Sequence, residues 1–159
     1  MAVSRSLFLP DDAATEALGR ALARHIGPGD TVLLSGQIGA GKTHLVRATI
    51  QAIGFDHGVG IEVPSPTYTL VQTYEFEGLT VWHADLYRLG DPGEVVELGL
   101  EDAMVSDAVL IEWSDRLPEP PEHALQIELS VQGEGRDCVI TSHSDRWAPL
   151  MDALDLANA

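Results

Sequence analysis

The residues best suited to chemistry form one glycine-rich run near the start of the chain, at positions 35–43. This run reads SGQIGAGKT and fits G-x-x-x-x-G-K-[ST], the phosphate-binding loop of P-loop nucleotidases. Glycines let backbone N–H groups turn towards phosphate oxygens, and the start of a following helix adds partial positive charge. The expected nucleotide-binding residues are Gly36, Gln37, Ile38, Gly39, Ala40, Gly41, Lys42, Thr43 and His44.

Two residues of this run have separate predicted tasks. Lys42 would reach the terminal phosphates and take part in catalysis, and the Thr43 hydroxyl would ligate Mg²⁺. Lys42 is the only lysine among nine basic residues, the rest being arginine. A compact ammonium suits a phosphate cradle that a planar guanidinium would overfill. A glycine-rich turn that binds no ligand stays the alternative.

The sequence on either side supplies the elements that must position this loop. Residues 31–34 are apolar enough for a buried strand, and residues 42–53 are expected to form a helix. The apolar positions of that helix are Leu45, Val46, Ile50 and Ile53. A strand, a glycine loop and a helix start are the context in which this motif binds phosphate.

Two acidic residues follow other predicted strands and are candidates for catalysis and for the metal. Glu112 comes directly after an apolar run at 108–111, and Asp85 follows the run at 81–84. Ligands of open α/β sheets bind at the carboxyl ends of the strands, so both acids are expected near the loop. Glu112 could hold Mg²⁺ through water or orient the attacking water, and Asp85 could be a second magnesium ligand.

A stiff segment with prolines at 64 and 66 holds two further candidates. Ser65 and Thr67 could form a switch that senses the terminal phosphate, although a proline-shaped connection explains the same pattern. Arg88 could face phosphate or form a salt bridge. Trp113 and Tyr87 are expected to be packing residues, and His83 a residue of its strand.

The remaining pattern predicts one α/β domain over residues 1–159. Strands are expected at 6–9, 107–112 and in two hairpins, 68–76 with 80–84 and 124–131 with 137–141. Helices are expected from Pro10 to about Ile26, in short pieces after Asp91 and Glu101, and at 145–156.

Charge and composition limit the classes of function. The chain of 159 residues has 9 basic and 25 acidic residues, for a net charge of −16. A surface that binds nucleic acid needs a basic patch. DNA is therefore not expected as a ligand, and RNA is expected to be bound only through a partner protein. The single Cys138 excludes an internal disulfide. No apolar stretch has the length of a leader or membrane span, which predicts a cytoplasmic protein.

Four motifs in this order resemble the TsaE (YjeE) family of bacterial P-loop ATPases. They are residues 36–43, the S-P-T segment 65–71, the H-x-D-x-Y-R segment 83–89 and the Ile111-Glu112-Trp113 run. The similarity spans about residues 7 to 117. Gln37 and His44 depart from the usual pattern, which is expected to tune affinity at most.

The resemblance implies a small P-loop domain with a mixed, mainly parallel central sheet flanked by helices. It implies ATP and Mg²⁺ as cofactors, with Thr43, Glu112 and Asp85 serving the metal. Asp12 and Thr15, in the first turn of the N-terminal helix, would lie near the adenine. The family acts on the TsaD–TsaB protein complex in forming threonylcarbamoyladenosine at position 37 of tRNA, so tRNA is an indirect partner.

Two other functions stay open at this point. A small-molecule P-loop kinase usually needs an arginine-rich lid, which the scattered arginines do not suggest. A non-catalytic nucleotide-sensing module would not require Glu112 and Asp85 beside Lys42 and Thr43. An intrinsically slow ATPase that a partner activates fits the residues best.

Overall fold

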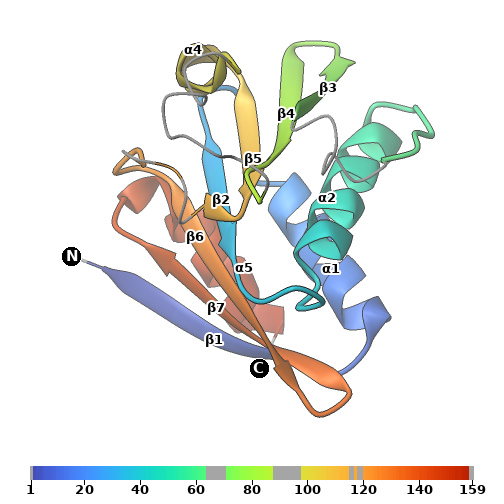
Figure 1. Ribbon diagram of the computed structural model, residues 1–159, viewed down its shortest axis with the longest axis vertical. Coiled ribbons are helices and arrows are strands. Elements are labelled where there is room, and N and C mark those ends of the chain that lie inside the picture. Colours follow the sequence, from blue (N-terminus) through green and yellow to red (C-terminus); the bar gives the residue numbers. More distant parts are fainter. Residues whose placement is uncertain (1, 64–70, 88–97, 115–116, 118–119, 158–159) are drawn as a thin grey trace.

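A computed structural model describes residues 2–63, 71–87, 98–114, 117 and 120–157. Its centre is a seven-stranded sheet in the order β1-β7-β6-β2-β5-β4-β3 (Figure 1). The strands are β1 (Val3–Leu9), β2 (Thr31–Ser35), β3 (Val71–Phe76), β4 (Leu79–Asp85), β5 (Ala108–Glu112), β6 (Leu125–Gln132) and β7 (Gly135–Ser142). The expected small α/β domain with a mixed sheet is therefore confirmed.

The sheet combines a parallel centre with antiparallel edges. The neighbouring pairs β2–β6, β2–β5 and β4–β5 are parallel, whereas β1–β7, β6–β7 and β3–β4 are antiparallel. Only β3 and β7 oppose the direction of the other strands, so the sheet is mainly parallel by strand direction although half of its pairs are antiparallel. The carboxyl ends of β2, β4 and β5 consequently meet at one edge.

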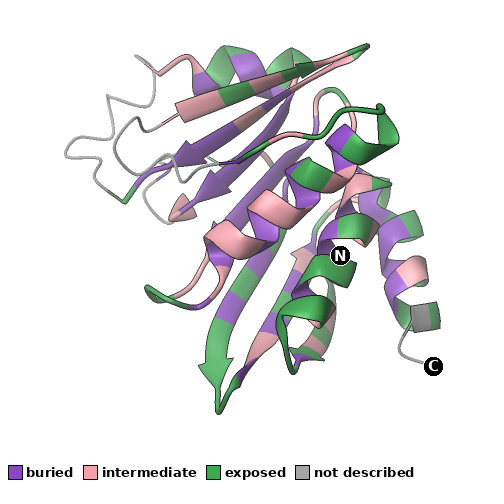
Figure 2. Cartoon of the chain, turned by 90° about the vertical axis from the view of Figure 1, so that its right-hand side faces the viewer, coloured by how far each residue is buried: buried purple, intermediate pink, exposed green. Residues whose placement is uncertain are grey.

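Helices cover the two faces of the sheet unequally. They are α1 (Asp12–Ala23), α2 (Lys42–Asp56), α4 (Leu100–Ser106) and α5 (Ala148–Ala157), the last preceded by a 3-10 turn at Asp145–Trp147. The central strands divide their apolar residues between the faces. Val32 and Leu34 pack with α1, α2 and α5, and Leu33 packs with α4. Figure 2 shows the resulting buried band along these strands.

Local sequence signals set most of the element boundaries. The Asp11 side chain accepts a hydrogen bond from the Ala14 backbone N–H (2.9 Å) and so caps α1. This helix ends at Ala23 rather than near Ile26, because the Gly27-Pro28 pair that follows disfavours continued helix. Both expected hairpins are present. The stretch 68–70 and the short helix expected after Asp91, up to residue 97, lie outside the described residues.

The pairing partners of the last hairpin lie far away in the chain. Strand β6 pairs with β2, the strand that leads into the glycine loop, and β7 pairs with the N-terminal β1. This arrangement brings Leu129 of β6 against Gly36, where a Cβ on the glycine would lie 2.2 Å from the Leu129 carbonyl oxygen. The hairpin therefore supports one side of the loop.

Candidate nucleotide-binding site

The loop between β2 and α2 has the backbone that its glycines allow. Gly36, Gly39 and Gly41 have φ values of 140°, 84° and 100°, a region that other residues rarely occupy. A Cβ at Gly39 or Gly41 would meet nothing within 4 Å, so the loop borders open space. No side chain caps the start of α2 at Gly41. Such an uncapped helix start beside open space suits an anion.

Lys42 is the first residue of α2, and its side chain reaches back to the glycine loop. Its ammonium donates hydrogen bonds to the carbonyl oxygens of Gly36 (2.6 Å) and Gln37 (2.9 Å). It also lies 4.1 Å from the centre of the Trp113 ring, a cation–π contact. Only 4% of the residue is exposed, so these contacts replace the water that a charge would otherwise need. The ammonium therefore lies against the backbone of the glycine loop, and its contact with bound phosphate stays a prediction.

Glu112 and Thr43 are brought together although 69 positions separate them. The Thr43 hydroxyl donates a hydrogen bond of 2.6 Å to Glu112 Oε1. Thr43 is in the first turn of α2, and Glu112 ends β5, which pairs directly with the loop-bearing β2. The carboxylate is 2% exposed. A hydroxyl and a carboxylate side by side are hard oxygen ligands of the kind that Mg²⁺ takes.

Asp85 occupies the equivalent end of the next strand. The register pairs it with Glu112 across β4 and β5. Its Oδ1 accepts a hydrogen bond from the Tyr87 backbone N–H (2.9 Å), which orients the carboxylate at the strand end. The expectation that both acids lie beside the loop is therefore confirmed, since both line one cavity with Lys42 and Thr43.

This cavity has a volume of about 380 Å³ and an aromatic wall. Tyr87 and Trp113 form that wall, with ring centres 4.9 Å apart. Trp113 has a φ of 58°, which is unusual for a bulky residue and costs about 1–3 kcal/mol. The strained backbone directly after Glu112 places the indole over Lys42. The rest of the lining is Ile38, Gly39, Gly41 and His44.

Several expected site residues lie elsewhere. Gly36 and Gln37 line a broader concavity with β6, and Ala40, within the loop, is fully buried. Asp12 is exposed and Thr15 is buried on α1, and neither lines the cavity. Their place near an adenine stays a prediction. Ser65 and Thr67 lie outside the described residues, as does Arg88.

Three residues that sequence reasoning left out of the site belong to its surroundings. Tyr87 and Trp113 were expected to be packing residues; they do pack on each other, and they also line the cavity. His83, expected only as a strand residue, is within hydrogen-bond distance of Glu112 (2.6 Å). Their nearness in the chain to Asp85 and Glu112 was the available signal.

The chemistry of these residues fits a magnesium nucleotide. The loop offers glycine backbone beside open space, an ammonium, and a hydroxyl paired with a carboxylate. Among the residues that the structure describes, no three His, Cys, Asp or Glu side chains gather into a metal centre. Mg²⁺ is commonly held by one or two protein ligands plus substrate phosphates, and the Thr43–Glu112 pair suits such shared binding.

The sequence is similar to known proteins over most of its length. The family model described as "Threonylcarbamoyl adenosine biosynthesis protein TsaE" matches residues 9–138. The tRNA threonylcarbamoyladenosine biosynthesis protein TsaE of Rickettsia felis is 37% identical over 142 residues, covering 87% of this chain and 81% of the relative. The protein of the same name from Bacillus subtilis is 34% identical over 145 residues, covering 88% and 87%.

A solved structure has the same fold. The crystal structure of Bacillus subtilis YdiB superposes with a TM-score of 0.76 at 24% identity, covering 100% of this chain and 99% of that one. That identity supports the fold alone, whereas the family match spans most of the chain. The chain belongs to the TsaE family of threonylcarbamoyladenosine biosynthesis proteins.

Proposed function

We propose that this protein is a Mg²⁺-dependent ATPase that acts with the TsaD–TsaB complex in forming N6-threonylcarbamoyladenosine at position 37 of tRNA, in the cytoplasm. The observation that carries the proposal is the Thr43–Glu112 hydrogen bond of 2.6 Å beside the ammonium of Lys42. A loop that only binds phosphate does not need a buried carboxylate next to its hydroxyl. Hydrolysis does need one, for the metal and the attacking water.

Each residue has a distinct role in this proposal. Lys42 neutralises charge on the terminal phosphates. Asp85, at the neighbouring strand end, would be a further ligand of the metal shell. Bound Mg²⁺ supplies charge stabilisation for phosphoryl transfer. The aromatic wall of Tyr87 and Trp113 shields one side of the cavity from bulk water, which strengthens these charge interactions.

A partner is expected because the described site is short of positive charge. Lys42 is the only Lys or Arg among the described residues that line the cavity. An arginine that stabilises the transferring phosphoryl group can increase turnover of a P-loop enzyme by about 10³–10⁵. We therefore infer slow hydrolysis by the isolated protein and faster hydrolysis once TsaD and TsaB are bound.

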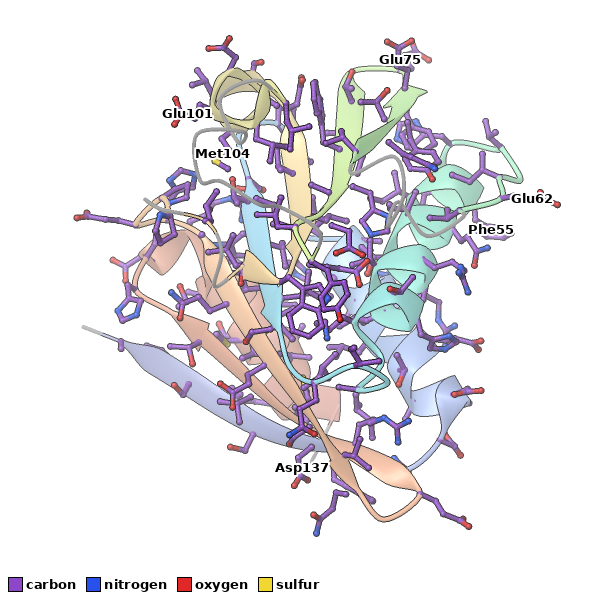
Figure 3. The ribbon with its side chains drawn as sticks, in the orientation of Figure 1. Phe55, Glu62, Glu75, Glu101, Met104 and Asp137 are labelled. Atoms are coloured by element: carbon purple, nitrogen blue, oxygen red, sulfur yellow. The ribbon has the colours of Figure 1, made fainter. Side chains whose placement is uncertain are left out.

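The distribution of charge supports a protein partner rather than direct contact with tRNA. The net charge is −16. Figure 3 shows acidic residues on several sides of the molecule, among them Glu62, Glu75, Glu101 and Asp137. Such a surface repels the phosphates of RNA and is complementary to a basic tRNA-handling assembly.

Two substitutions test whether the protein turns ATP over or only senses it. Glu112→Gln should keep ATP binding and lose turnover, because the amide keeps the shape but not the charge. Lys42→Ala should lose ATP binding itself. Binding is measured by calorimetry, and turnover by phosphate release with TsaD and TsaB present. Wild type and Glu112→Gln proteins that are equally inert with these partners would establish the sensing module instead.

The small-molecule kinase is the remaining alternative. It predicts a phosphorylated metabolite beside ADP in a screen of common metabolites with ATP, whereas the proposed ATPase transfers the phosphoryl group to water and yields ADP and inorganic phosphate. A product that forms with wild type and not with Lys42→Ala would favour the kinase.

A further inference from the structure

Two separate elements hold the carboxylate of Glu112. Thr43 of α2 donates to Oε1 at 2.6 Å, and Nε2 of His83 lies 2.6 Å from Oε2. His83 belongs to β4, where the register places it opposite Leu110, two residues before Glu112. The imidazole is fully buried and the carboxylate is 2% exposed. Both oxygens of the candidate metal ligand are therefore occupied by partners inside the protein.

The hydrogen-bond pattern identifies which imidazole nitrogen carries the proton. An ionised carboxylate only accepts hydrogen bonds, so Nε2 of His83 must be the donor. Nδ1 of His83 is buried and has no hydrogen-bond partner among the residues that the structure describes. The contact with Glu112 therefore requires a proton on Nε2.

The other fully buried residues of β4 show that burial at this place does not require a histidine. They are Val81 and Ala84, and both are apolar. Placing an imidazole there costs desolvation that an aliphatic side chain would avoid. The hydrogen bond to Glu112 is the contact that a histidine makes and an aliphatic residue cannot.

We propose that His83 is a positioning residue for Glu112. It fixes Oε2, so that Oε1 stays directed at the Thr43 hydroxyl and the pair is ready to receive Mg²⁺ with ATP. Partners of this kind, one step behind a ligand, typically contribute about 10- to 100-fold to metal affinity. The inference rests on the proposed function, because it assigns His83 a part in magnesium-dependent nucleotide binding.

Three variants separate positioning from simple packing. His83→Gln keeps an N–H donor at about the reach of Nε2, whereas His83→Leu keeps the volume and loses the donor. Val81→Ala is the matched control, since it removes buried methyl groups from the same strand, and Val81 is packed in the main apolar core. Each protein is titrated with a non-hydrolysable ATP analogue by calorimetry, in EDTA and in excess Mg²⁺, and its thermal unfolding is recorded.

The measured quantity is the factor by which magnesium tightens analogue binding. His83→Leu should reduce this factor by about 10- to 100-fold and leave the affinity in EDTA unchanged. His83→Gln should retain most of it, and Val81→Ala should retain all of it despite a lower Tm. A His83→Leu protein with the wild-type factor, or a His83→Gln protein as defective as His83→Leu, would overturn the positioning role.

Failure of the proposed function gives a different result. If magnesium does not change the affinity of the wild-type protein for the ATP analogue, the proposed Mg²⁺-dependent ATPase is refuted. Any role of His83 towards the metal is then refuted as well. The hydrogen bond itself is tested independently in the ligand-free protein by NMR with ¹⁵N-labelled histidine. We expect a slowly exchanging proton on Nε2 of His83; a proton found only on Nδ1 would contradict the arrangement.

Discussion

The close contact between the glycine loop and β6 makes a quantitative prediction for Gly36→Ala. An ideal Cβ at Gly36 would lie 2.2 Å from the Leu129 carbonyl oxygen and 3.2 Å from its carbon. Cβ contacts below 3.0 Å do not occur in proteins, so the chains must separate by about 0.8 Å at this point. The atom that must move is a backbone oxygen of β6, a strand that is hydrogen-bonded to β2 on one side and to β7 on the other.

The expected loss of stability has two parts. Overpacking of this kind costs about 1–3 kcal/mol, and the φ of 140° adds about 1–3 kcal/mol of backbone strain for alanine. Gly36→Ala should therefore lower the free energy of unfolding by about 2–6 kcal/mol, a large fraction of the 5–15 kcal/mol that a typical domain has. The matched control is Gly39→Ala, where a Cβ meets nothing within 4 Å. Only the strain of its φ remains, about 1–2 kcal/mol.

Urea unfolding followed by circular dichroism measures both variants against wild type. The difference between them should be at least about 1 kcal/mol, because overpacking applies to Gly36→Ala alone. Equal stabilities would show that β6 does not press on the loop as described. If Gly36→Ala is too unstable to purify while Gly39→Ala folds, the order of the two costs is still established.

Three further predictions concern residues away from the cavity. Burial raises the pKa of the Cys138 thiol to about 12, so at pH 8 a thiol reagent should modify the native protein slowly and the urea-unfolded protein at once; an immediate native reaction would contradict this. The hydrogen bond from Arg5 lowers the pKa of Asp155 in the folded state, so its stabilisation is present above the ordinary carboxyl pKa and is lost as the pH falls through the lowered value. The Tm difference between wild type and Asp155→Asn should therefore shrink on acidification, and a constant difference would disprove the link. Asp30→Ala should cost about 1–3 kcal/mol in urea unfolding, since it leaves the Gly27 N–H (2.8 Å) and the Arg146 guanidinium (3.1 Å) without their acceptor; a neutral effect would mean that water replaces the carboxylate.

The parts of the fold that could be predicted are those with local signals. The strand, loop and helix around Lys42 follow from one motif, and the hairpin turns follow from Gly78 and Gly133. The two acids could be placed at the sheet edge because both end apolar strands. That inference needed no knowledge of strand order, since carboxyl ends of parallel strands meet at one edge.

The parts that could not be predicted depend on contacts between distant segments. Nothing local in β6 indicates that it pairs with β2, or that β7 pairs with β1 more than 120 positions away. The backbone of Trp113, with φ of 58°, is set by tertiary packing against the preference of the residue. The contact of His83 with Glu112 required the register of β4 against β5, which hydrophobic alternation does not determine.

No described helix combines the length and the apolar character needed to cross a membrane.

The central claim is that partner proteins activate an ATPase. The direct measurement is the rate of phosphate release from ATP with and without TsaD and TsaB, each with and without tRNA. The account predicts a low rate for the isolated protein, a marked rise with the partners, and no rise for Glu112→Gln. A full rate in the isolated protein that the partners leave unchanged would contradict it.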